Sequence, residues 1–182
     1  MKTLLLIAVI SLASLNATQA QTFLTKNGKI SFFSKTSMEN IEAVNNQAMS
    51  VLDTKSGSLQ FSVQITGFLF KKALMQEHFN EDYMESGKYP RATFKGTITD
   101  ISKVDFTKDG NYAVNVTGNL TLHNVTNKVT VPGTIAIAGG KINATSTFNV
   151  LVADYKIDIP KVVQNNISKS IEIKVDCNYQ PK

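Results

Sequence analysis

Side chains that could carry acid–base or metal chemistry are sparse in this sequence. His78 and His123 are the only histidines, and the carboxylates Glu77, Glu81 and Asp82 lie close to the first of them. A zinc site needs three or four Cys, His or carboxylate ligands at workable spacing. The two histidines are far apart, and no H-x-H or H-E-x-x-H pattern occurs. We therefore expect neither a metal nor a cofactor, and we expect His123 to order a turn.

Nucleophilic catalysis has equally little support in the residues. No G-x-S-x-G elbow is present, and Cys177 is the only cysteine, without a base nearby in sequence. It falls on the apolar face of an expected strand, where a free cysteine behaves as a small hydrophobic side chain. Carboxylates such as Glu39, Glu42 and Glu85 surround irregular segments, as solvated loop charges do. An enzyme that uses His78 with nearby carboxylates, such as Glu77 or Asp82, remains an alternative, but we expect that the protein is not an enzyme.

Residues 1–20 have the pattern of an export signal. Lys2 gives a positive start, the run from Leu4 to Leu15 is almost wholly apolar, and small residues precede a cleavage expected before Gln21. The apolar run is too short to span a bilayer. We expect a signal peptide over residues 1–20 and one domain over residues 21–182. The expected location is the bacterial periplasm, with secretion into the medium as the alternative.

Composition limits the partners that the domain could have. The formal net charge is +5 at pH 7, and the basic residues are spread along the chain. A nucleic-acid-binding protein would gather Lys and Arg with aromatic residues on one face, so no nucleic-acid partner is expected. With a single cysteine, an exported domain of this kind has no internal disulfide and must depend on packing.

The elements that must position these side chains are mainly strands. Alternation of apolar and polar residues indicates a half-buried strand, and it is clearest in segments 59–66, 111–122 and 170–179. Further strands are expected over 23–33 (one strand, or a pair that turns at Asn27-Gly28), 45–53, 92–106, 129–137 and 142–153. Turns are expected at 53–57, 109–110, 123–128 and 139–140. Residues 38–43 fit either a helical turn or a strand, and residues 154–166 should connect irregularly, with a short helical or extended piece.

Two features interrupt the alternation. Met75, Phe79 and Tyr83 recur every four residues, as one face of a short helix would. Pro132-Gly133 should shift the register of its strand, and a bulge or an edge is expected there because proline cannot donate to a sheet ladder. A helical segment inside a chain of closely spaced strands predicts an antiparallel barrel or sandwich with one apolar plug.

Three segments resemble the YceI-like family of exported lipid-binding proteins. They are GSLQFSVQITGFLF at 57–70, LMQEHFNEDYMESGKYPRATFKG at 74–96 and VTGNLTLHNVTNKVTV at 116–131. The most specific parts are His78-Phe79, KYPRATF at 88–94 and LTLHNVTNKVTV at 120–131. Many members have a glycine after the turn histidine, where this chain has Asn124. Asparagine tolerates a left-handed turn conformation, so we expect the hairpin to be preserved.

The resemblance implies an all-β fold, an eight-stranded antiparallel lipocalin-like barrel with a short helical cap. It also implies a long apolar pore that holds a polyisoprenoid chain, such as a quinone tail, without a covalent bond. From the residues alone, a barrel packed solid and a barrel with a ligand cavity both remain open. The alternative to a periplasmic lipid-tail carrier is therefore an exported stress-response or interaction module with a packed core.

A hollow barrel would be lined by the apolar faces of its strands and plug. Burying each CH₂ group is worth about 0.8 kcal/mol, so a long tail needs an apolar lining more than a charged anchor. His78 is expected as a polar side chain at the cavity mouth, and an open mouth leaves room for a transient membrane-surface contact or a homodimer. The expected lining is Phe61, Val63, Phe68, Phe70, Leu74, Met75, Phe79, Phe94, Leu120, Leu122, Ile135, Phe148 and Ile173.

Overall fold

The computed structural model describes residues 22–182, so the expected signal peptide and its cleavage before Gln21 lie outside the described residues. The strands are β1 (Thr22–Lys35), β2 (Asn40–Asp53), β3 (Ser58–Gln64), β4 (Leu69–Phe70), β5 (Arg91–Ile98), β6 (Gly110–Leu122), β7 (Val125–Ala138), β8 (Lys141–Leu151) and β9 (Ser170–Pro181). The helical elements are α1 (Ala73–His78), the π-helical turn η2 (Phe79–Tyr83) and the 3-10 turns η1 (Ile65–Gly67), η3 (Ile101–Lys103) and η4 (Val152–Tyr155). No helix within residues 22–182 has the length and apolar character needed to cross a membrane.

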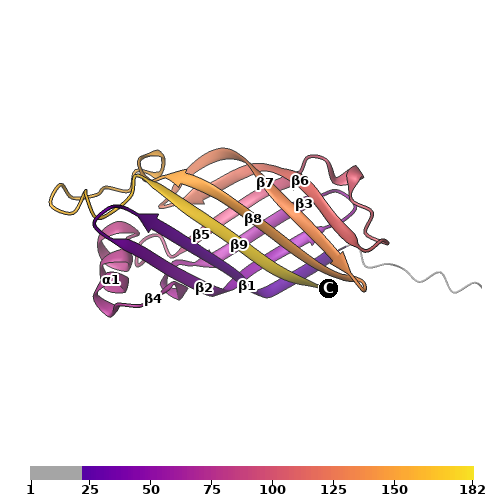
Figure 1. Ribbon diagram of the computed structural model, residues 1–182, viewed down its shortest axis with the longest axis horizontal. Coiled ribbons are helices and arrows are strands. Elements are labelled where there is room, and N and C mark those ends of the chain that lie inside the picture. Colours follow the sequence, from indigo (N-terminus) through magenta and orange to yellow (C-terminus); the bar gives the residue numbers. More distant parts are fainter. Residues whose placement is uncertain (1–21) are drawn as a thin grey trace, which may run out of the picture.

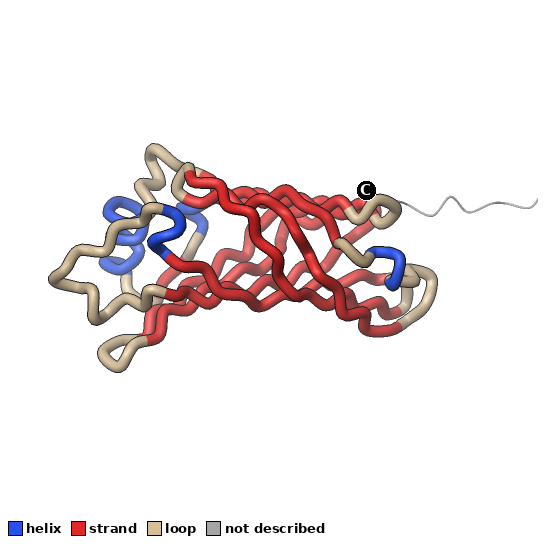
Figure 2. Tube along the Cα trace, turned by 90° about the horizontal axis from the view of Figure 1, so that it is seen from above, coloured by secondary structure: helices blue, strands red, loops and turns tan. Residues whose placement is uncertain are grey.

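Eight of these strands close into an antiparallel barrel. Their order is β1-β9-β8-β7-β6-β5-β3-β2, and pairing of β1 with β2 closes the ring. β4 adds two residues beside β2. The barrel is elongated, with α1, β4 and the 156–169 loop at one end (Figure 1), and strands form nearly all of its wall (Figure 2). The expected eight-stranded barrel with a short helical cap is confirmed.

The end of the barrel opposite α1 is filled by a packed core. Inward-facing residues of seven strands meet there, and Leu52, Ile135 and Cys177 are at most 2% exposed. One polar pair is buried among them, because the Ser50 and Tyr179 hydroxyl oxygens lie 2.6 Å apart and hydrogen-bond to each other. Burial raises the pKa of the Tyr179 hydroxyl, so this pair stays neutral at ordinary pH. We call this half the closed end and the α1 end the mouth.

Cys177 should not react with thiol reagents while the protein is folded. Its side chain is fully buried, and burial raises the pKa of the thiol to about 12. Because the thiolate is the reactive species, we expect no alkylation by iodoacetamide at pH 8 in native protein and complete alkylation in denaturant. Mass spectrometry of both samples measures this, and rapid alkylation of the native sample would contradict the burial.

Two glycines allow β5 and β6 to approach closely. Gly96 and Gly118 are register partners, and a Cβ on Gly118 would lie 2.5 Å from the Gly96 Cα and 2.6 Å from the Phe94 ring. Gly118→Ala should therefore lower the free energy of unfolding by about 1–3 kcal/mol, the usual cost of overpacking. Gly87→Ala is the control, because its Cβ would meet nothing within 4 Å. Equal denaturation midpoints for both variants would contradict the close approach.

The Asn27-Gly28 turn that we allowed as an alternative does not form. β1 runs through it as one strand, with register shifts on both sides of Gly28 in its pairing with β2. Gly28 is needed for space, since a Cβ there would lie 2.7 Å from the Cys177 sulfur. An asparagine–glycine pair can thus mark a bulge inside a strand as well as a hairpin turn.

Other boundaries also differ from the expected ones. Residues 40–43 belong to β2, after a hairpin in which the Thr36 hydroxyl accepts the N–H groups of Met38 and Glu39. The expected strand over 92–106 stops at Ile98, and η3 follows it. The expected 123–128 turn shrinks to His123 and Asn124, whose φ angles of 48° and 59° confirm that asparagine sustains the left-handed hairpin.

The expected register shift at Pro132-Gly133 is wrong. β7 pairs with β6 in one unbroken register from Gly110↔Ile137 to Leu122↔Val125, so no bulge forms on that side. The same face continues through Val131, Gly133 and Ile135. The expected edge does exist, because the pairing of β7 with β8 ends at Thr134↔Thr145.

Candidate functional site: an apolar cavity in the barrel

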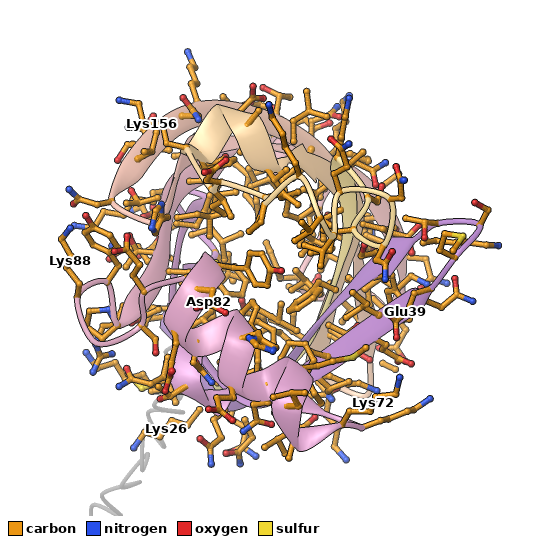
Figure 3. All side chains as sticks on the ribbon, turned by 90° about the vertical axis from the view of Figure 1, so that its left-hand side faces the viewer. Lys26, Glu39, Lys72, Asp82, Lys88 and Lys156 are labelled. Carbon is orange, nitrogen blue, oxygen red and sulfur yellow. The ribbon has the colours of Figure 1, made fainter. Side chains whose placement is uncertain are left out.

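The mouth half of the barrel is hollow. A cavity of about 610 Å³ extends from α1 to the closed-end core, and nearly all of its border is apolar. Figure 3 looks along the barrel from the mouth, with α1 and η2 crossing the lower part of the opening. This volume lies within the range of about 300–1,000 Å³ that is typical of ligand pockets. The interior of the described barrel is therefore packed at the closed end only, whereas the interaction-module alternative expects a core without a continuous cavity.

Every apolar residue expected to line the cavity borders it. These residues come from α1, η2, seven of the strands and the residue after η1, and His78 also reaches the border at the mouth. Their contact with a ligand remains a prediction. The residues are Phe61, Val63, Phe68, Phe70, Leu74, Met75, Phe79, Phe94, Leu120, Leu122, Ile135, Phe148 and Ile173.

Four aromatic side chains cluster where the helical plug meets the barrel wall. Phe79 of η2 lies with its ring centroid 5.3 Å from that of Phe32, 5.7 Å from Phe68 and 5.0 Å from Phe70. Ring pairs at this separation contribute about 0.5–1.5 kcal/mol beyond the area they bury. We call these four residues the mouth aromatic cluster. They come from β1, β4, η2 and the residue after η1, so this cluster ties the helical plug to the barrel wall.

The polar groups at the mouth are mostly solvent-exposed. The His78 Nδ1 lies 2.6 Å from the Asp82 Oδ2, and these side chains are 51% and 56% exposed. Lys72 pairs with Glu39 at 3.1 Å. Exposed pairs of this kind contribute little to stability. Within residues 22–182, no group of three or more His, Cys, Asp or Glu side chains could hold a metal ion.

His123 does more than order its turn. Its Nε2 lies 2.8 Å from the Glu85 Oε2, and its side chain is 13% exposed. The Tyr89 ring meets the imidazole edge-on at 4.7 Å. These contacts fasten the return segment after η2 to the β6–β7 hairpin. Sequence reasoning missed this pair, because the two residues are distant in the chain and Glu85 has an unusual φ of 43°.

Part of the lining was also missed. Ile30 and Phe32, which share one face of β1, could have been predicted from the alternation of that strand. The 156–169 loop gave no periodic signal, yet it bends over the mouth and contributes four apolar side chains. The missed lining residues include Ile30, Phe32, Ile157, Ile159, Val163, Ile167, Ile171 and Val175.

Comparison with known proteins assigns the family. A family model described as "YceI-like domain" matches residues 11–179. The chain belongs to the YceI-like family. A curated relative, UPF0312 protein VPA0850 of Vibrio parahaemolyticus, is 34% identical over 84 residues, which cover 43% of this chain and 41% of that protein. The match therefore spans less than half the length of that relative.

Solved structures similar to this YceI-like chain have the same barrel. A polyisoprenoid-binding domain from Saccharophagus degradans, implicated in plant cell wall breakdown, has a TM-score of 0.78 at 14% identity and covers 90% of this chain and 100% of its own. Burkholderia cenocepacia BcnA has a TM-score of 0.70 at 21% identity, with coverage of 84% and 96%. The Campylobacter jejuni YCEI protein has a TM-score of 0.57 at 18% identity, with coverage of 75% and 81%. At these identities the likeness supports the fold of this YceI-like chain.

Proposed function

We propose that the protein is an exported, non-enzymatic binding protein that holds an isoprenoid tail, such as that of a quinone, or another long apolar lipid tail. The observation that carries this proposal is the cavity of about 610 Å³ with an almost wholly apolar border. The YceI-like family and its polyisoprenoid-binding relative agree with it. A periplasmic location is part of the proposal and rests on the export pattern of residues 1–20.

The cavity suits a hydrocarbon better than a polar substrate. Each CH₂ group that leaves water for this interior contributes about 0.8 kcal/mol, and a flexible methionine at position 75 adapts to an irregular chain. A charged ligand would find few partners inside, because the charged and imidazole side chains on the border (Glu39, Lys72 and His78) lie at the mouth. A polar head group would therefore stay at the mouth while the tail occupies the interior.

The mouth also presents apolar side chains to solvent. Met38, Leu69, Leu74 and Val162 are between 60% and 91% exposed and come from four segments at this end of the barrel (Figure 1). A transient contact of this rim with a membrane surface would let a tail transfer without crossing water. Leu74→Ser combined with Val162→Ser should slow transfer of a bound probe to lipid vesicles several-fold. A transfer rate equal to that of the parent protein would contradict the contact.

A chain-length series tests the binding function. The probes are farnesol, geranylgeraniol and a longer polyprenol, and the measurement is displacement of a fluorescent isoprenoid from delipidated protein. We expect saturable binding whose affinity rises with tail length until the cavity is full. Because the proposed energy comes from buried CH₂ groups, an affinity that does not change with length, or the absence of saturable binding, would overturn the proposal.

A further inference from the structure

The backbone ladder between β7 and β8 covers only part of the length over which these strands lie along the barrel wall. Their ladder has five residue pairs, from Ala138↔Lys141 to Thr134↔Thr145, and then ends. Each strand remains fully paired on its other side, β7 with β6 as far as Val125 and β8 with β9 as far as Leu151. Residues 125–133 and 146–151 therefore face each other as two unpaired edges in the mouth half of the wall. We call this line the seam.

Pro132 explains why the ladder stops. Its partner on β6 is Asn115, whose N–H donates to the Asp100 Oδ1 at 3.0 Å and whose carbonyl accepts the Thr99 N–H at 2.9 Å. Both groups of Asn115 therefore point away from β7. In an antiparallel ladder this makes Asn115 and Pro132 a non-hydrogen-bonded pair, so the Pro132 backbone is directed toward β8. Because proline has no N–H, the bond that would continue the β7–β8 ladder cannot form.

Side chains, not backbone hydrogen bonds, close the seam. Val129 and Val131 on one edge and Phe148 and Val150 on the other all border the cavity, and the first three are only partly buried. The cavity border also includes Thr134 and Thr145, the last pair of the β7–β8 ladder, although the alternation of their strands turns these side chains outward. Thr93 on β5 borders the cavity in the same way.

Two hydrogen bonds made by side chains lie at the ends of the seam. The Ser146 hydroxyl donates to the Pro132 carbonyl at 2.6 Å, and the Asn127 amide donates to the Asp154 carbonyl at 2.7 Å near the mouth. Between them, opening requires side-chain rotations, which are far faster than rearrangements of a hydrogen-bonded sheet. Between β5 and β6, consecutive pairs close the wall at the same depth. The other short ladder, between β2 and β3, is continued toward the mouth by the Asn45 amide, which donates to the Gln64 carbonyl, and by β4, which pairs with β2.

We propose that the seam is a lateral portal through which the apolar tail enters and leaves the cavity sideways. The inference rests on the proposed function and adds its route. A tail that entered end-on through the mouth would have to move its entire length past the mouth aromatic cluster. Sideways entry passes the side chains of the seam, whose cavity-facing row is apolar and whose solvent-facing row includes Thr130 and Asn149.

Locking the seam tests the portal. Thr130→Cys combined with Asn149→Cys places one exposed thiol on each edge, and a disulfide-cleavable bifunctional thiol reagent then joins them. Lys95→Cys combined with Asn119→Cys is the matched control, because these exposed residues are register partners across the intact β5–β6 ladder. The buried Cys177 contributes no background labelling. Stopped-flow fluorescence of a dansyl-labelled farnesol gives the rates of uptake and release.

We expect the locked seam to slow uptake and release at least tenfold, with equilibrium affinity unchanged and both rates restored when the linker is cleaved. The locked control should exchange at the parent rate. Ser146→Ala, which removes the hydrogen bond to Pro132, should accelerate exchange several-fold. Unchanged rates in the locked seam would overturn the portal, as would equal slowing in the control. Failure of the unmodified protein to bind the probe would instead refute the proposed function.

Discussion

Phe79→Asp should weaken the binding of an isoprenoid probe by at least about a hundred-fold. Phe79 borders the cavity and lies at the centre of the mouth aromatic cluster. The substitution places a carboxylate against the proposed tail, and burying an unpaired polar or charged group costs several kcal/mol, of which about 2.8 kcal/mol already corresponds to a hundred-fold loss. Equilibrium titration with the dansyl-labelled probe measures the change.

Two controls separate binding from folding in this experiment. Met49→Asp makes the same chemical change on the outer wall of β2, where the side chain is 50% exposed, and Lys55→Asp places a carboxylate in the turn at the closed end. Both variants should retain parent affinity. Phe79→Leu preserves an apolar plug and should lose far less affinity than the aspartate variant. Equal affinities for Phe79→Asp and Met49→Asp would mean that the plug does not contact the tail.

Ala144→Trp should reduce the affinity for long tails more than for short ones. Ala144 borders the cavity where β8 is still paired with β7, so an indole there would fill the hollow near its inner end. Displacing about three CH₂ groups of a long tail would cost about 2.4 kcal/mol, or roughly 50-fold in affinity. Farnesol, which need not reach this depth, should lose much less.

The matched control for this substitution lies on the outer wall. Ala113→Trp adds the same side chain at an exposed position of β6 and should leave the affinity for both tail lengths unchanged. The comparison is made with the chain-length series used for the parent protein. If Ala144→Trp lowers the affinities for farnesol and for the long polyprenol by the same factor, the long tail does not extend to the depth of Ala144.

Much of the site could be predicted because strands alternate so regularly. Residues such as Val63, Leu120 and Ile173 fall on the apolar face of half-buried strands, and closure of the sheet turns that face inward. The spacing of Met75, Phe79 and Tyr83 likewise predicts the helical plug, and all three residues border the cavity. Alternation does not show whether the inward side chains meet one another across the barrel. The hollow interior was therefore expected from the family resemblance alone.

The remaining features depend on contacts between distant residues. Gly28 is needed because a Cβ there would meet the Cys177 sulfur, and the pairing of His123 with Glu85 requires the return segment after η2. The sequence predicts correctly that Pro132 interrupts a ladder, but the register shift that it predicts along β7 does not occur. Only its partner Asn115 decides toward which neighbouring strand the missing N–H is directed.

The most direct test of the hollow carrier is the content of the barrel as the native host makes it. Protein purified from that host under mild conditions would be extracted with organic solvent, and the extract analysed by lipid mass spectrometry against an extract of the Phe79→Asp variant. We expect an apolar molecule with a long hydrocarbon tail at close to one per protein, and its depletion in the variant. Recovery of no stoichiometric apolar molecule from the parent protein would contradict it.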